Sequence, residues 1–166
     1  MTARGNRATP RFVYGMTALA LVSITLAPAC GTIEPEVGER LTACADADSN
    51  PAVKVSFAKD IRPLMNGTVV GPKPCKNCHY SSGGSKEGLN ETGFDLETLA
   101  SLRKGGRRTS DDIVVPGSPC KSAIIQKIRG TYEGGRMPKG GPYWTPEQTQ
   151  LFMDWIAEGA LGDGLE

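Results

Sequence analysis

The chain has 166 residues and a mass of 17.6 kDa, which is enough for one folded domain with its own core but too little for two of ordinary size. With 39% hydrophobic residues, 22% charged residues and a formal net charge of +1, it is neither a disordered polyelectrolyte nor a protein of many membrane spans. Its 21 glycines and 12 prolines predict short regular elements joined by long loops. It has five cysteines and a single histidine, His79.

The N-terminus has the pattern of a secretory signal peptide. Three arginines and no acid occur in residues 1–12, an apolar run follows over 13–26, and small residues precede Cys30. The apolar run is shorter than the roughly 20 residues that span a bilayer, so a transmembrane helix is the weaker alternative. We therefore expect residues 1–29 to be a signal peptide that is removed.

The segment from Leu26 to Gly31 resembles a bacterial lipoprotein signal, which implies a lipid on Cys30. A soluble periplasmic protein without lipid is the alternative. Residues 30–52 are acidic and contain two prolines, so they are predicted to be a disordered tether before a domain at 53–162. Removal of the signal takes away three arginines and leaves no basic excess that would favour nucleic-acid binding.

Four segments of the domain carry helix signals. Ser56 is placed to cap the first of them, and Pro63 should kink or shorten it because proline lacks an amide hydrogen. The apolar face of this helix consists of Phe57, Ile61, Leu64 and Met65. Asp95 is placed to cap a second helix over 96–104.

Ser118 and Pro119 are expected to open a third helix that runs to Gly130. The fourth helix has the strongest start, a capping box between Thr145 and Gln148 with proline at the first helical position. Its apolar arc contains Leu151, Phe152, Trp155 and Ile156, and Glu147, Asp154 and Glu158 lie opposite. The strand signals are short and weak.

Residues 75–79 read Cys-Lys-Asn-Cys-His, which is the attachment sequence for c-type haem. On one helical turn, Cys75 and Cys78 can reach the two haem vinyl groups while His79 reaches the iron from the same side. A structural zinc site would need a second pair of ligands at short spacing, and a redox dithiol of the thioredoxin type would need a βαβ pattern. Neither context surrounds the motif, so covalent haem is favoured over both.

The iron would need a sixth ligand, and the chain offers no second histidine. Three methionines of the domain are candidates: Met65, Met137 and Met153. Met65 and Met153 lie on predicted apolar helix faces and are more simply explained as core residues. Met137 lies in a loop rich in glycine and proline, from which a thioether could reach a metal end-on.

In these residues the chain resembles the cytochrome c family, and more closely its planctomycete-type single-haem domains. The resemblance runs from Ser56 to Leu161 and combines the haem motif with Met137–Pro138 and the Trp155 helix in the family's order. It implies an all-α, small cytochrome c-like fold of three to four short helices and long loops wrapped around one covalent haem c. It also implies His79 as proximal ligand, Met137 as distal ligand, and crossing first and last helices.

The chain departs from the family pattern at two points. Residues 66–74 form an insertion before the haem motif, which is expected to loosen the coupling between the first helix and the haem. No proline lies between His79 and Pro116, so the carbonyl that should accept the ring N–H of the histidine is not identified by the sequence.

A six-coordinate His/Met iron transfers single electrons, so the expected function is that of an electron carrier and not an enzyme. The expected partner is a redox protein outside the cytoplasm, in the periplasm or cell envelope, with the membrane reached through lipid at Cys30. A ligand sensor or weak peroxidase with a displaceable Met137 is the alternative. Cys44 and Cys120 remain as a candidate disulfide or as two free thiols.

Overall fold

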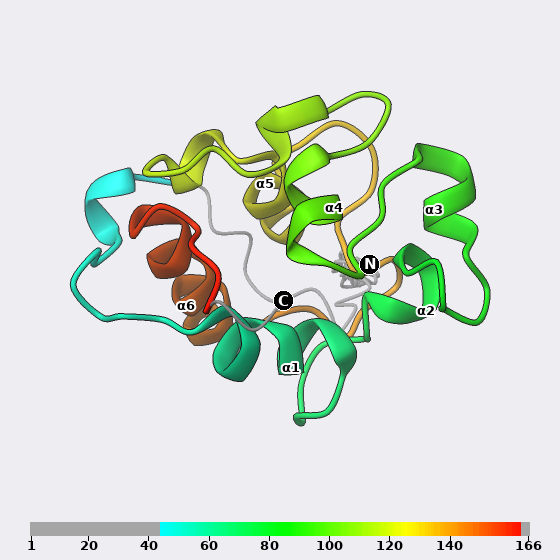
Figure 1. Cartoon of the computed structure of the whole chain (residues 1–166), viewed down its shortest axis with the longest axis horizontal. Coiled ribbons are helices and arrows are strands. Elements are labelled where there is room, and N and C mark those ends of the chain that lie inside the picture. The colour runs from blue at the N-terminus through cyan, green and yellow to red at the C-terminus, as the bar shows by residue number, and fades with distance from the viewer. Residues whose placement is uncertain (1–43, 164–166) are drawn as a thin grey trace, which may run out of the picture. The chain divides into compact units, whose positions relative to one another are not determined.

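The structure, a computed structural model, describes residues 44–163, and these fold into helices joined by long loops (Figure 1). The α-helices are α1 (Arg62–Asn66), α2 (Lys76–His79), α3 (Glu87–Thr92), α4 (Leu99–Lys104), α5 (Ala123–Arg129) and α6 (Pro146–Ala157). Shorter segments are the 3₁₀ turns η1 (Asp46–Asp48), η3 (Ser110–Ile113) and η4 (Pro119–Lys121), and the π-helix η2 (Phe57–Ile61). No strand occurs between residues 44 and 163, so the predicted all-α class is confirmed there.

The number of helices exceeds the predicted three to four. Six α-helices lie within residues 44–163, because the helical turn expected at the Cys75–His79 motif forms α2 as a helix of its own, and α3 follows it where a loop was expected. The signal peptide predicted for 1–29 and the lipid site at Cys30 lie outside the described residues. Within 44–163, no helix is both long and apolar enough to cross a membrane.

The first predicted helix changes from the π-helix η2 to α1 between Ile61 and Arg62, just before Pro63. The Ser56 hydroxyl accepts a hydrogen bond from the Lys59 N–H at 3.0 Å and caps η2. Proline cannot donate the next helical hydrogen bond, and the π-helix passes into α1, which carries Pro63 in its first turn. The predicted apolar face is buried throughout, with Phe57 and Ile61 fully inaccessible.

Helix α4 begins three residues later than expected. The Asp95 carboxylate instead accepts the Glu97 N–H at 2.9 Å in a local turn. The Thr98 side chain caps the helix by accepting the Ser101 N–H, and the Ser101 hydroxyl accepts the Thr98 N–H at 3.0 Å. The predicted start at residue 96 was wrong because this reciprocal Thr98–Ser101 pair satisfies more amide groups than Asp95 could alone.

The third predicted helix is two elements. Pro119 opens only the 3₁₀ turn η4, and extended backbone at Ser122 separates that turn from α5. The Ser122 hydroxyl donates to the Ser118 carbonyl and accepts the Val115 N–H at 2.9 Å, which explains the full burial of a polar side chain. Gly130 ends α5 with a φ of +76°.

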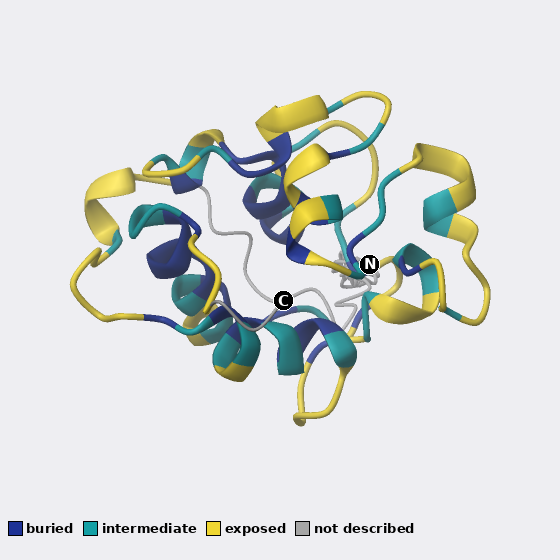
Figure 2. Cartoon of the chain, in the orientation of Figure 1, coloured by how far each residue is buried: buried dark blue, intermediate teal, exposed yellow. Residues whose placement is uncertain are grey.

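Helix α6 forms the centre of the core, and its predicted capping box is present between Thr145 and Gln148. Three aromatic contacts surround it: Phe57–Trp155 at 5.1 Å, Phe152–Trp155 at 5.5 Å and Trp144–Phe152 at 5.5 Å between ring centroids. The first of these joins η2 to α6, so the first and last helices do pack together. Figure 2 shows the buried positions gathered on α1, α4, α5 and α6, whereas α3 is mostly exposed.

Residues 44–52, which the sequence assigned to the tether, are held against the domain; we name them the N-terminal strap. Cys44 and Cys120 form a disulfide. The Asn50 N–H donates to the Asp154 carboxylate at 2.7 Å, and the Gln150 amide donates to the Asp48 carbonyl at 3.0 Å. Asp154 therefore lies buried beneath the strap, contrary to its expected place on a solvated helix face.

Candidate functional site

Helix α2 brings the three residues of the Cys75–His79 motif to one turn. The Cys75 carbonyl accepts both the Cys78 N–H at 3.1 Å and the His79 N–H at 2.9 Å. Both cysteines are free thiols and only partly exposed. The local fold therefore presents two sulfurs and one imidazole from a single turn, as the motif predicts.

The imidazole of His79 is held by the backbone of residue 94. Its Nδ1 lies 3.2 Å from the Phe94 carbonyl oxygen, which can only accept, so the proton is on Nδ1. The Phe94 ring meets the imidazole edge-on at 5.7 Å between centroids. Burial lowers the pKa of His79 below its usual value, and the Phe94 hydrogen bond and the charge of Asp95 oppose this only in part.

Phe94 is the group that sequence reasoning could not identify. Every residue has a backbone carbonyl, so no residue type identifies this acceptor. It lies fifteen residues after the histidine in the chain, and the Leu96 N–H donates to the His79 carbonyl at 2.9 Å just beyond it. The segment 94–96 therefore contacts both the side chain and the backbone of His79.

The insertion at 66–74 does not detach the motif from the first helix. The Cys75 N–H donates to the Met65 carbonyl at 2.9 Å, and the Tyr80 hydroxyl donates to Asn66 at 2.7 Å. Gly67 packs so closely on Pro74 that an added Cβ would stand 2.5 Å from the proline ring. The expected loosening is therefore not observed, because the insertion is closed at its base by these contacts.

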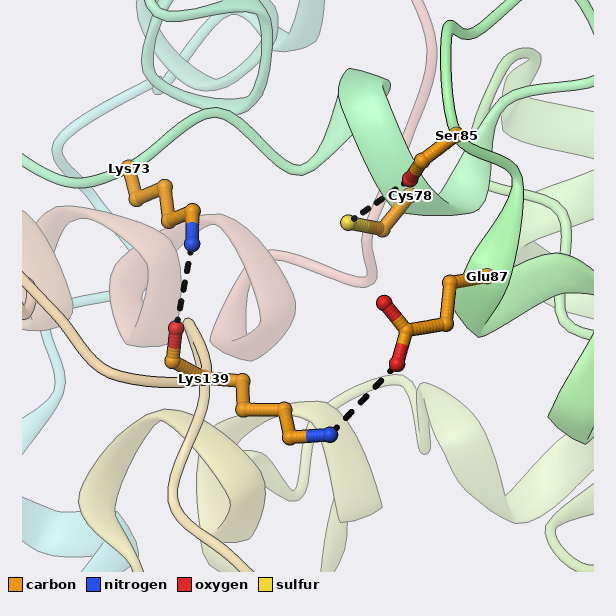
Figure 3. A network of polar contacts seen from close by, with 5 residues as sticks. All are labelled: Lys73, Cys78, Ser85, Glu87 and Lys139. Carbon is orange, nitrogen blue, oxygen red and sulfur yellow. Dashed lines mark hydrogen bonds and ion pairs between the residues drawn. The ribbon is translucent and has the colours of Figure 1, made fainter.

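The loop that carries Met137 meets the chain on both sides of the motif. The Lys73 N–H donates to the Pro142 carbonyl at 3.1 Å, and the Lys73 ammonium donates to the Lys139 carbonyl at 3.3 Å. On the other side, the Lys139 ammonium pairs with Glu87 of α3 at 3.5 Å (Figure 3). Met137 is partly exposed, and its own N–H is bound by the Lys127 carbonyl at 2.9 Å.

The other two candidate methionines lie in the core. Met65 is 1% exposed and Met153 is 2% exposed, and both belong to the cluster of buried apolar residues formed by α1, α5 and α6. This agrees with their expected packing role. Of the three, Met137 alone lies in a loop that contacts the segments flanking the motif.

Two further polar groups bear on what this site can hold. Trp144 is only 3% exposed, and its buried indole N–H has no hydrogen-bond acceptor. Burial raises the pKa of the Cys75 thiol to about 12, so the sulfur is a neutral thiol. Within residues 44–163, no group of three or more His, Cys, Asp or Glu side chains could hold a metal ion by itself.

The donor set fits haem c. The Nδ1–H bond to Phe94 leaves the lone pair on Nε2 for a metal, and burial keeps the ring neutral. Two thiols on the same turn match two attachment points.

Comparison with known proteins gives one finding. Residues 75–141 match the family model described as Planctomycete cytochrome C. The match begins at the first cysteine of the motif and ends within the loop that carries Met137. No curated protein and no solved structure matches the chain significantly.

Proposed function

We propose that this chain, whose residues 75–141 belong to the planctomycete cytochrome c family, transfers single electrons through one covalently bound haem c. The observation that carries the proposal is the His79 geometry, in which the Phe94 carbonyl engages Nδ1 and leaves the Nε2 lone pair available to a metal. When bound, haem supplies an iron that alternates between the ferric and ferrous states. The long loops around α2 would enclose it.

Cys75 and Cys78 would attach the haem by adding their S–H bonds across its two vinyl groups. Each sulfur forms a bond to carbon while its hydrogen moves to the neighbouring carbon, so no oxidant is required. The position of both thiols on the turn that carries His79 supports this assignment. Attachment and ligation from one short helix would fix the cofactor to the domain.

Met137 would supply the sixth ligand. Its loop is tied to Lys73 before the motif and to Glu87 after it, and the other two candidates are enclosed in the core. A thioether opposite an imidazole favours the reduced iron relative to a second histidine. An iron held by both His79 and Met137 would suit outer-sphere electron transfer.

The proposal extends to place and partner. The arginine-rich start, the apolar run and Cys30 support export and a lipid anchor in the cell envelope, although these residues lie outside the described part of the chain. An extracytoplasmic redox protein would then supply or accept the electron. A disulfide between Cys44 and Cys120 is consistent with an oxidising compartment.

The first experiment is to make the protein in a host that attaches c-type haem. The denatured protein should retain haem that organic solvent does not extract, and the reduced native protein should show a low-spin c-type spectrum. Loss of covalent haem in Cys75→Ser with Cys78→Ser, as the matched control, assigns the attachment. Wild-type protein without covalent haem would refute the proposed function.

The distal ligand is tested by Met137→Ala. The ferric protein should lose the charge-transfer band of methionine-ligated iron, whereas Met153→Leu and Met65→Leu, which keep the core volume, should retain it. Persistence of the band in Met137→Ala would assign the ligand to another methionine. Binding of carbon monoxide by native ferrous wild-type protein would instead favour the ligand-sensing alternative.

A further inference from the structure

Helix α3 packs against α2, and its second residue, Gly88, lies against the imidazole of His79. A Cβ atom built on Gly88 would stand 2.5 Å from Cε1, 2.6 Å from Nε2 and 2.9 Å from Nδ1. Because these three ring atoms are almost equally distant, the atom would lie over the face of the ring. Carbon atoms do not approach so closely, so alanine cannot replace glycine with both elements in place.

The backbone gives no other reason for a glycine here. Gly88 lies inside a helix and is not among the glycines with a left-handed φ. Alanine is the better helix former at such a position. The absence of a side chain is therefore explained by the imidazole beside it.

Helix α3 is fixed at both ends and cannot easily move away from the ring. At its start, the N–H groups of Ser85 and Lys86 donate to the Asn77 carbonyl of α2 at 3.0 and 3.2 Å. Near its end, the Arg107 guanidinium donates to two carbonyls of α3, at 3.2 and 2.9 Å. A methyl group at position 88 would therefore displace the ring more readily than the helix.

The other restraints on His79 come from the chain that follows α3. The Phe94 carbonyl accepts the Nδ1–H, and the Phe94 ring packs against the imidazole edge. Residues 88–94 thus contact the ring on its face, on its protonated nitrogen and on its edge. One segment restrains both the tilt and the rotation of the imidazole.

We propose that Gly88 is a positioning residue that sets the orientation of the His79 imidazole and keeps its Nδ1–H on the Phe94 carbonyl. This inference rests on the proposed function, because its consequence concerns the iron that Nε2 would ligate. A side chain at position 88 turns or pushes the ring and lengthens the Phe94 hydrogen bond. A weaker Nδ1 hydrogen bond makes Nε2 a poorer donor, which disfavours ferric iron and raises the reduction potential.

The test compares Gly88→Ala with Gly84→Ala. Gly84 lies between α2 and α3, has no left-handed φ, and has no heavy atom within 4 Å of an added Cβ, so it is a matched control. Both haem-loaded variants are measured by redox titration and by electron paramagnetic resonance of the ferric iron. We expect Gly88→Ala alone to shift the g-values and to raise the potential, and unchanged values in Gly88→Ala overturn the inference.

A second measurement needs no variant and covers the case in which Gly88→Ala fails to fold. In reduced wild-type protein, a His/Met low-spin iron is diamagnetic, so a nuclear Overhauser effect should join the Gly88 α-protons to the His79 Hε1 proton. Its absence overturns the inference. A wild-type protein without haem refutes the proposed function, whereas haem-loaded protein without this contact refutes only the role of Gly88.

Discussion

Removal of the Cys44–Cys120 disulfide should destabilise the domain by several kilocalories per mole. The bond joins residues 76 positions apart and encloses the whole of η2, α1, α2, α3 and α4. In the chain-entropy treatment, a closed loop of this length lowers the free energy of folding by about 4.5 kcal/mol at room temperature. Hydrogen bonds also hold the N-terminal strap, including Cys120 N–H to Asp46 at 2.7 Å, so the observed loss should lie between about 2 and 4.5 kcal/mol.

The assay is denaturant unfolding of wild-type protein and of the double variant Cys44→Ser with Cys120→Ser, followed by far-ultraviolet circular dichroism. The double variant removes both partners of the disulfide, so neither Cys44 nor Cys120 is left as an unpaired thiol that could form a wrong disulfide. A disulfide reductant should destabilise the wild type towards the variant and leave the variant unchanged, with both samples held in the ferrous state. A loss below about 1 kcal/mol would refute the reasoning, because the strap would then be held by its other contacts alone.

Two smaller effects are expected at helix α6 and at the turn after α2. Thr145→Ala removes the oxygen that accepts the Gln148 N–H and should lower the free energy of unfolding, measured with denaturant, by about 1 kcal/mol. Thr145→Ser should stay close to wild type, and a Thr145→Ala variant as stable as wild type would contradict the capping role. Hydrogen bonds from Ser81 and Ser82 lower the pKa of Glu97 from 4.5 to about 2, so its charge stabilises the fold above pH 4.5 and the gain is lost as the pH falls towards 2. The advantage of wild type over Glu97→Gln in unfolding should shrink over that interval, and a pH-independent difference would count against the hydrogen-bonded carboxylate.

Local signals in the sequence predicted the elements they control directly. The capping box at Thr145 fixed the start of α6, and the apolar spacing identified Phe57, Ile61, Leu64 and Met65 as one buried face. The start of α4 was missed because two capping signals three residues apart competed. Thr98 is the actual cap because the Ser101 hydroxyl accepts the Thr98 N–H, and residue preference alone does not predict that bond.

Features that depend on distant contacts could not be predicted. The cysteines gave Cys44–Cys120 as a candidate disulfide, but the rest of the strap looks disordered from its composition. Its residues Asp46, Asp48 and Asn50 nevertheless form hydrogen bonds with residues more than seventy positions away. The Asp154 carboxylate was likewise expected on a solvated helix face, but in the fold Asn50 covers it and donates a hydrogen bond to it. Polar composition indicates weak burial, but it does not exclude specific pairing with a partner far along the chain.

At the candidate site, the sequence identified the side chains that are proposed to hold the haem, but not the groups that position them. Cys75, Cys78 and His79 are recognisable because their side-chain chemistry and spacing are unusual together. Phe94 acts through a backbone carbonyl and Gly88 through the lack of a side chain, so neither leaves a chemical signature in the sequence. A glycine within a segment that otherwise forms a helix is the one signal that could have indicated the contact.

The closed base of the 66–74 loop makes the length of that loop independent of the position of the motif. The Cys75 N–H donates to the Met65 carbonyl, so a change of loop length around Val70 leaves the two ends together. The Val70 side chain at the loop tip is fully exposed, and only its carbonyl is engaged, by the Gln148 amide at 3.4 Å. The side chain at position 70 is therefore a point at which a fluorophore can be introduced beside the motif, whereas Lys73 has to be kept because it holds the Met137 loop.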